Sequence, residues 1–124
     1  MDYKKILIVD DSETSQMIIK RCFEMAGFDE AEFASAGDGL QALNFLEYNP
    51  VDLIVSDLNM PKMGGADLLK KLTLKENTKN IPVVIITSLQ GERVREELGD
   101  MDIKGVIRKP VSPVAVNNIF AKEV

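Results

Sequence analysis

The chain has 124 residues, a formal net charge of −5, a single cysteine and no histidine. This length is enough for one domain with its own core, and 45% apolar with 28% charged residues is ordinary globular usage. The negative charge, without any run of Lys or Arg, disfavours nucleic acid or an anionic membrane as a partner. The absence of histidine excludes a histidine base, a histidine metal ligand and a phosphohistidine within this chain.

The single cysteine and the N-terminal residues indicate where the protein works. Cys22 cannot form an internal disulfide, so we expect a buried structural thiol in a reducing, cytoplasmic environment. Only four consecutive apolar residues precede Asp10, too few for a signal peptide or a membrane span. We see no linker, repeat or low-complexity tail, and we expect residues 1–124 to form one domain.

The chain opens with a predicted strand and helix. Residues 5–9 are apolar apart from Lys5, which predicts a strand buried on both faces. Ser12 or Asp11 would cap the helix that follows, and Gly27 would end it. We expect the apolar residues that recur at helical spacing in this helix to belong to the core: Met17, Ile18, Cys22, Phe23 and Ala26.

The middle of the chain repeats this alternation. Residues 32–36 are more polar and predict an edge strand, followed by a turn at 37–39. A second helix continues through Leu40, Leu43 and Leu46, which we also expect in the core, and it stops before Asn49-Pro50. The apolar run 51–57 then predicts a strand buried on both faces that ends in Asp57.

The last third completes the pattern. After a third helix, Pro82 begins the clearest strand, 82–86, at a position where no backbone donor is needed. A short helix at 92–98 and a strand at 105–108 follow, and Ser112 with Pro113 opens the last helix. Five strand–helix alternations predict an α/β domain with a five-stranded parallel sheet and helices on both faces.

Five polar residues lie at or just after the predicted ends of four strands: Asp10, Asp11, Asp57, Thr87 and Lys109. The carboxyl ends of parallel strands meet at one edge of the sheet, where open α/β sheets bind ligands. Three neighbouring carboxylates repel one another and need cations. Lys109 supplies one positive charge, and Mg²⁺, which prefers carboxylates, water and phosphoryl oxygens, suits the rest.

This set of groups is suited to transfer of a phosphoryl group onto a carboxylate. Asp57 would attack phosphorus, Asp11 and Asp57 would hold Mg²⁺, and Lys109 and Thr87 would contact the phosphoryl oxygens. No proton has to leave the nucleophile, so the missing histidine is no obstacle. Taken one by one, the same residues have structural explanations: a helix cap for the Asp10–Asp11 pair, a turn residue, a strand end and a surface lysine.

Five motifs in order resemble the receiver domain of two-component response regulators, of the single-domain CheY type, over essentially the full length. The motifs are Asp10-Asp11 after residues 6–9, the stretches 36–43 and 57–65, Thr87-Ser88, and Lys109-Pro110. The resemblance implies a flavodoxin-like sheet of strand order 2-1-3-4-5.

The resemblance also implies residue roles. Asp57 matches the phosphoacceptor, and Asp10 and Asp11 match the acidic pair, with Asp11 as the direct Mg²⁺ ligand and Asp10 acting through water. The backbone carbonyl of Asn59 matches the third protein ligand. Thr87 matches the switch hydroxyl and Lys109 the phosphate-contacting lysine, whose bond to Pro110 is cis in the family.

The implied partners are a histidine kinase or histidine phosphotransfer protein as phosphodonor and a downstream protein target. The target would dock on the fourth helix, fifth strand and fifth helix, including Lys104, Val106 and Arg108, or the phosphoryl group would move on to another histidine. The sequence departs from the family at Val106, where a Tyr or Phe is usual, and at Gly64, where Asp is frequent. Valine has no ring through which a threonine–aromatic coupling could act.

Two other classes of function remain open. One is a receiver-like binding module that works without phosphorylation, which Val106 favours. The other is a phosphatase with Asp57 as its nucleophile, but Asn59 stands where such enzymes place an acidic residue as proton donor. We expect a phosphoacceptor regulator that catalyses only its own phosphorylation and dephosphorylation, rather than an enzyme that turns over a substrate.

Overall fold

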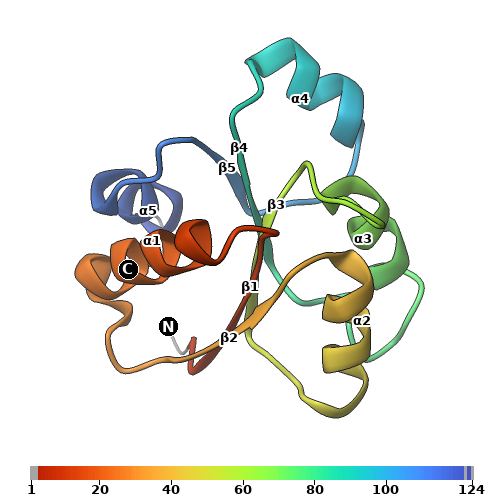
Figure 1. The fold of residues 1–124 in the computed structure, drawn as a ribbon, viewed down its shortest axis with the longest axis horizontal. Coiled ribbons are helices and arrows are strands. Elements are labelled where there is room, and N and C mark those ends of the chain that lie inside the picture. The colour runs from red at the N-terminus through yellow and green to blue at the C-terminus, as the bar shows by residue number, and fades with distance from the viewer. Residues whose placement is uncertain (1–2, 122, 124) are drawn as a thin grey trace.

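The computed structural model describes residues 3–121 and 123, which form five strands alternating with five α-helices (Figure 1). The strands are β1 (Lys5–Val9), β2 (Glu32–Ala36), β3 (Leu53–Asp57), β4 (Val83–Thr87) and β5 (Gly105–Arg108). The helices are α1 (Glu13–Phe23), α2 (Gly39–Tyr48), α3 (Gly65–Leu72), α4 (Gly91–Leu98) and α5 (Pro113–Phe120), and a short turn of π-helix, η1 (Glu24–Phe28), extends α1.

The five strands make one parallel sheet of order β2-β1-β3-β4-β5, which confirms the expected fold. β3 and β4 are buried along their whole length, as is β1 apart from Lys5, and all three lie inside the sheet. The more polar β2 lies at one edge, as its composition predicts, and β5 lies at the other. Continuous apolar runs therefore occupy the positions that are covered on both faces.

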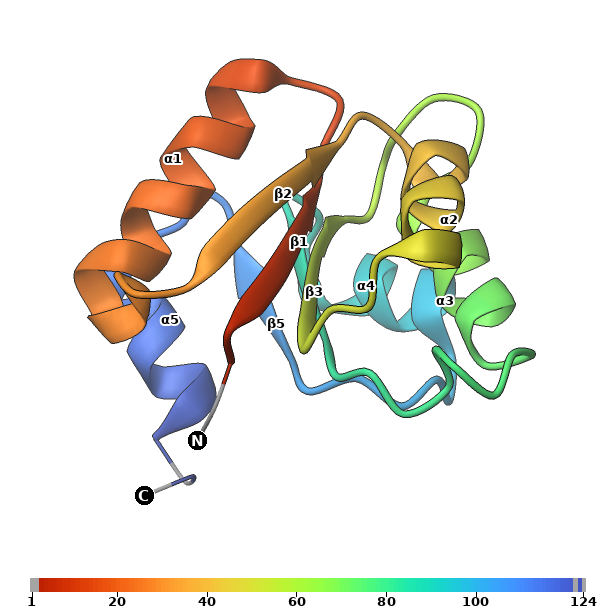
Figure 2. The ribbon, with the colours of Figure 1, turned by 90° about the horizontal axis from the view of Figure 1, so that it is seen from below.

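Helices cover both faces of the sheet (Figure 2). α1 and α5 pack on one face around Ile6, Ile8, Phe23 and Phe120, while α2, α3 and α4 cover the other around Leu7 and other buried aliphatic residues. Successive residues of β1 alternate between the two clusters because side chains of a strand point to opposite faces. The two cores together hold the strand ends in a fixed register.

Local side-chain caps set where three helices begin. The hydroxyl of Ser12 accepts a hydrogen bond from the backbone N–H of Ser15, so Ser12, one of the two expected caps, starts α1. Ser112 caps α5 in the same way with Pro113 at the first helical position, as predicted. Asp38 caps α2 by accepting from the N–H of Gln41. Each cap satisfies a helix N–H that has no partner inside the helix.

The prediction that the apolar residues named in the first two helices belong to the core is wrong at three positions. Met17 is 71% exposed, Ile18 is 49% exposed and Leu40 is 45% exposed. The face of α1 that packs on the sheet is set by Ile19, Cys22 and Phe23, and Met17 lies about 200° around the helix from Ile19. Helical spacing alone does not choose which of two apolar stripes faces the sheet.

Two further expectations can be compared with the fold. Cys22 is buried, as expected, with its sulfur 3.7 Å from the carbonyl oxygen of Val111. Pro82 lies just before β4 rather than within it, and its carbonyl accepts a hydrogen bond from the N–H of Ile54. Within the described part of the chain, the helices are all too short or too polar to cross a membrane.

Candidate functional site

Asp57 ends the central strand β3 and is 7% exposed. The chain turns immediately afterwards, and α3 begins with Gly65 against the end of the strand. A Cβ at Gly65 would lie 2.5 Å from the carbonyl oxygen of Asp57, so only glycine allows this close approach. The loop between Asp57 and Gly65 therefore folds tightly against the carboxyl end of β3, where the carboxylate of Asp57 lies.

The carboxylate of Asp57 makes two short contacts. Its Oδ1 accepts a hydrogen bond from the N–H of Leu58 at 2.8 Å, and its Oδ2 lies 3.1 Å from Nζ of Lys109. Burial raises the pKa of Asp57, and the neighbouring Asp10 raises it further, while Lys109 and the N–H of Asn59 oppose this. The net pKa lies above that of an ordinary aspartate, so the ionised form of Asp57 is poorly stabilised by this chain alone.

Asp10 is fully buried directly after β1. Its Oδ1 accepts from the N–H of Ser12 at 2.9 Å, and its Oδ2 accepts from the hydroxyl of Ser15 at 2.7 Å. Nζ of Lys109 lies 3.4 Å from the same Oδ2. Both oxygens of Asp10 therefore already have partners, and the side chain does not cap α1, whose cap is Ser12.

Asp11 is exposed and completes a cluster of three carboxylates. One oxygen each from Asp10, Asp11 and Asp57 lies within 4.8 Å of the other two. Three carboxylate oxygens at this spacing form a donor set that fits a hard divalent cation such as Mg²⁺. Because Asp10 is occupied by Ser12 and Ser15, Asp11 and Asp57 are the better placed direct ligands.

Lys109 is the cation that this chain places in the cluster. Burial alone would lower the pKa of its ammonium group, but the carboxylates of Asp57 and Asp10 raise it, and the net pKa lies above that of an ordinary lysine. Lys109 is therefore charged at neutral pH. The peptide bond from Lys109 to Pro110 is cis, as the family resemblance implies.

Thr87 and Asn59 lie beside the cluster, but their predicted roles remain predictions. Thr87 ends β4 and is buried, and its hydroxyl oxygen accepts from the N–H of Leu89 at 3.1 Å. Its carbonyl accepts from the N–H of Lys109 at 2.8 Å, which ties the two residues together. The backbone N–H of Asn59 lowers the pKa of the Asp57 carboxyl group, and Asn59 is exposed.

Two residues of the site, Ser15 and Gln16, were not predicted from the sequence. The hydroxyl of Ser15 and the side-chain amide of Gln16 bond to Asp10, Gln16 through the backbone carbonyl at 2.7 Å. Both residues lie in the first turns of α1, directly after the acidic pair. Polar side chains in the first turn of a helix that starts at a strand end are a usable signal, because this geometry returns them toward that end.

The residues expected at the downstream docking surface lie along or just before the edge strand β5. Val106 is 38% exposed, and Arg108 is exposed. Lys104, by contrast, forms an ion pair with Glu123, and its ammonium lies 5.2 Å from the ring centre of Phe120. Lys104 is therefore engaged within the molecule, whereas Val106 and Arg108 face solvent.

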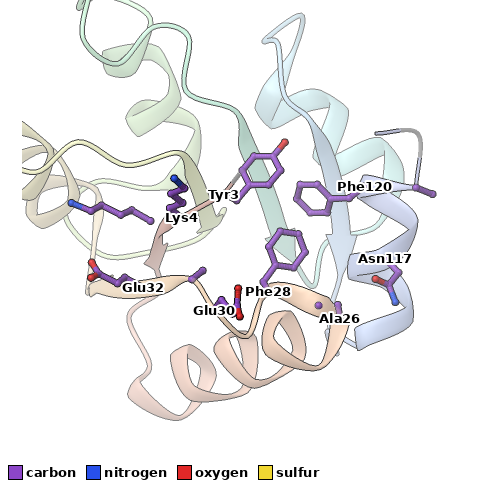
Figure 3. Close-up of a pocket in the computed structure, with 12 residues that line it drawn as sticks. Tyr3, Lys4, Ala26, Phe28, Glu30, Glu32, Asn117 and Phe120 are labelled. Carbon is purple, nitrogen blue, oxygen red and sulfur yellow. The ribbon is translucent and has the colours of Figure 1, made fainter. Parts of the chain in front are cut away.

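A large cavity lies at the other end of the strands, around the start of β1 and β2. It measures about 930 Å³, and Figure 3 shows the rings of Tyr3, Phe28 and Phe120 directed toward one another within it. The remaining lining residues come from the ends of α5 and η1 and the starts of β1 and β2. None of the predicted site residues lines this cavity, so cavity size does not identify the site here.

Comparisons with known proteins find matches over nearly the whole chain. The model of the response regulator receiver domain matches residues 6–121. The chemotaxis protein CheY-3 of Vibrio cholerae is 40% identical over 118 residues, which cover 95% of this chain and 89% of that protein.

Solved structures share the fold. The signal receiver domain of a signal transduction histidine kinase from Syntrophus aciditrophicus is 29% identical with a TM-score of 0.82, covering 96% of this chain and 88% of that one. The chemotaxis response regulator CheY4 of Vibrio cholerae is 26% identical with a TM-score of 0.82, covering 99% and 100%. The chain belongs to the response regulator receiver domain family.

Proposed function

We propose that this chain is a phosphoacceptor that takes a phosphoryl group onto Asp57 with the help of Mg²⁺. The observation that carries the proposal is the cluster of three carboxylates within 4.8 Å, with Lys109 at 3.1 Å from Asp57. A nucleophile, a cation site and a fixed positive charge thus meet at one strand end. The proposal makes the chain a signalling regulator of the two-component type.

The residues divide into ligands and supports. Asp11, Asp57 and the backbone carbonyl of Asn59 would hold Mg²⁺, with Asp10 acting through water because its oxygens already accept from Ser12 and Ser15. When bound, the ion neutralises charge on the carboxylates and on the phosphoryl oxygens.

The nucleophile needs no base, because Asp57 attacks as a carboxylate. A carboxylate oxygen of Asp57 forms the new bond to phosphorus while the bond to the leaving group breaks, and the electron pair of that bond stays with the leaving group. The ammonium of Lys109 balances a phosphoryl oxygen, which it can do because its raised pKa keeps it charged. The buried position of Asp57 excludes bulk water, which strengthens these charge interactions.

Thr87 would donate a hydrogen bond to another phosphoryl oxygen. A hydroxyl has one proton to donate and lone pairs to accept with. The N–H of Leu89 already occupies the hydroxyl oxygen of Thr87 as an acceptor. The hydroxyl proton therefore remains available for the phosphoryl group.

The direct test is phosphorylation by a small donor. We expect incubation with acetyl phosphate and Mg²⁺ to add one phosphoryl group, seen by intact mass, and we expect Asp57→Asn to abolish it. Asp29→Asn, an exposed aspartate outside the cluster, is the matched control and should react like the wild type. Uptake that persists in Asp57→Asn would refute the assignment of Asp57.

These 124 residues contain no histidine, so the phosphohistidine of a donor must lie outside them. We propose a histidine kinase or histidine phosphotransfer protein as donor, and a downstream protein that docks on α4, β5 and α5. Val106 and Arg108 are the accessible residues of this surface, while Lys104 would first have to leave Glu123. The similarity to chemotaxis proteins makes a chemotaxis-type pathway the first one to examine.

Val106 supports a second candidate function, a binding module that works without phosphorylation. A valine at this exposed edge position offers no ring that could change its packing when Thr87 moves. Titration of a captured partner with and without beryllofluoride and Mg²⁺ distinguishes the two. Tighter binding with beryllofluoride supports a phosphorylation switch, and equal binding supports the second candidate.

A further inference from the structure

A groove adjoins the acidic cluster at the mouth of the site. It has a volume of about 480 Å³ and shares Asp11 and Asn59 with the site. From there it follows the loop after β3 and the first turns of α3 toward the last turn of α4. We call it the α3 groove. Besides Asp11 and Asn59, its lining includes Leu58, Met60, Pro61, Asp67, Lys70 and Glu97.

The α3 groove combines an apolar wall with an acidic one. Leu58, Met60 and Pro61 supply the apolar atoms. Asp67 on α3 and Glu97 on α4 are exposed carboxylates, against one ammonium group from Lys70. None of the ion pairs formed by residues 3–121 and 123 involves these three side chains. Their charges therefore act on whatever enters the groove.

The chemistry of transfer requires room beside the site for a leaving group. In a phosphoryl transfer the attacking and leaving atoms lie roughly in line on opposite sides of phosphorus. Asp57 is only 7% exposed, so a donor can approach it only from the solvent side, where Asp11 and Asn59 are exposed. Asp11 and Asn59 belong to both the site and the α3 groove. The groove is therefore the space next to the site that the leaving group can occupy.

Two kinds of leaving group would meet different surroundings there. The imidazole of a phosphohistidine is a flat ring that suits an apolar wall. When that ring is protonated, its second nitrogen donates a hydrogen bond that a carboxylate can accept. The leaving group of an acyl phosphate is a carboxylate, which the charges of Asp67 and Glu97 repel. The ammonium group of Lys70 disfavours a protonated imidazole and favours a departing carboxylate.

We propose that the α3 groove is the subsite for the leaving group of the phosphodonor, and that Asp67 and Glu97 make it select imidazole over a carboxylate. The inference rests on the proposed phosphorylation of Asp57. In the selected reaction the oxygen–phosphorus bond to Asp57 forms and the phosphorus–nitrogen bond breaks. Its electron pair returns to the ring nitrogen, and because the second nitrogen of the ring already carries a proton, neutral imidazole leaves. With an acyl phosphate the phosphorus–oxygen bond breaks instead and the electron pair leaves on a carboxylate.

The test compares two small donors, phosphoimidazole and acetyl phosphate, on the same protein with saturating Mg²⁺. The readout is the ratio of their second-order rate constants, obtained by intact mass over time. Both rates are measured at the same ionic strength of about 0.15 M, where the Debye length is about 8 Å, so charges that line the groove still act on the leaving group while remote charges are largely screened. We expect Asp67→Asn/Glu97→Gln to lower the phosphoimidazole to acetyl phosphate ratio by about threefold to fivefold, the size of exposed charge interactions.

Two further variants make the test specific. Lys70→Gln removes the opposing charge, so the ratio should move in the other direction. Glu92→Gln/Glu96→Gln is the matched control, because both residues are exposed on α4 but do not line the groove. This control should leave the ratio unchanged. Amide chemical shifts on Mg²⁺ titration should show that every variant still binds Mg²⁺ and is saturated at the concentration used, which shows that the cluster is intact.

The outcomes separate the subsite from the proposed function. If neither donor phosphorylates the wild-type protein, the proposed function fails. If both donors react but the Asp67→Asn/Glu97→Gln ratio equals that of the wild type, or both rates change by the same factor, the leaving-group subsite is refuted. If the control variant changes the ratio as much as the groove variant does, the effect belongs to overall charge and the subsite is likewise refuted.

Discussion

The two ends of the parallel strands carry opposite kinds of chemistry. We call the carboxyl ends of the strands the carboxyl edge of the sheet and their amino ends the amino edge. At the carboxyl edge, three carboxylates lie within 4.8 Å of one another and depend on Lys109 for a fixed counter-charge. At the amino edge, the rings of Tyr3, Phe28 and Phe120 lie with their centres 5.0–5.9 Å apart. Aromatic packing stabilises the fold, whereas crowded like charges oppose it. One edge therefore contributes stability and the other contributes a site.

The largest expected effect comes from the aromatic edge. Phe23 is fully buried, with its ring centre 5.4 Å from that of Phe28, and Phe23→Ala should lower the free energy of unfolding by about 3–5 kcal/mol. Urea unfolding followed by circular dichroism measures the loss. Tyr48→Ala removes an aromatic ring that is 85% exposed and should change stability little. An equal loss in both variants would contradict the comparison.

The second effect is stabilisation of the carboxyl edge by Mg²⁺. A ligand that binds only the folded state at ten times its Kd raises the free energy of unfolding by about 1.4 kcal/mol. We expect this increase in the wild type and its loss in Asp11→Asn, whose carboxylate belongs to the cluster. Thermal unfolding across a Mg²⁺ titration measures it. Full stabilisation of Asp11→Asn would exclude Asp11 as a ligand.

The third effect depends on pH and tests how far burial and repulsion from Asp10 disfavour the ionised carboxylate of Asp57. The folded-state pKa of Asp57 is raised, so its contribution to stability is present at low pH and is lost as pH rises through that folded-state pKa. Without Mg²⁺, Asp57→Asn should therefore be more stable than the wild type by about 1 kcal/mol at pH 7, and the difference should shrink toward pH 4. Urea unfolding at both pH values in the presence of a chelator measures it.

Asp29→Asn serves as the control for that comparison, because Asp29 is exposed and lies outside the cluster. Its effect should be small at both pH values. A wild type that is more stable than Asp57→Asn at pH 7 would show that the contact with Lys109 outweighs the burial and repulsion of the carboxylate.

The smallest effect concerns the ion pair at the amino edge. Lys104 and Glu123 form an ion pair, and Glu123 also accepts a hydrogen bond from the hydroxyl of Tyr3 at 2.8 Å. Glu123→Gln keeps an acceptor for Tyr3 but removes the charge, so the free energy of unfolding should fall by about 0.5 kcal/mol. Glu76→Gln removes the charge from an exposed pair with Lys79 and should have no measurable effect. Urea unfolding of the two variants side by side decides the point.

The strands were the most predictable part of the fold. The apolar runs of β1, β3 and β4 appear inside the sheet, and the polar β2 at an edge, because a strand covered on both faces must be apolar throughout. The helix faces were less predictable. Met17 and Ile18 fit an apolar stripe of α1 as well as Cys22 does, and only packing against the sheet selects Cys22 and leaves the other two exposed.

The candidate site was also predictable only in part. Motif spacing placed Asp10, Asp57 and Lys109 at strand ends, and the structure joins these three side chains directly. The hydrogen bonds from Ser15 and Gln16 to Asp10 were not predicted, because serine and glutamine in a first helical turn are common and only their distance from Asp10 gives them a role.

The sequence by itself determined the alternation of strands and helices, the residues at the strand ends and, through its motifs, the family. These properties follow from local pattern and from the order of residues along the chain. Only the tertiary structure decided that three carboxylates meet within 4.8 Å, that Lys104 is held by Glu123, and that a groove with Asp67 and Glu97 adjoins Asp11. Each depends on distances between segments far apart in the chain, which the packing of helices on the sheet fixes and no local pattern contains.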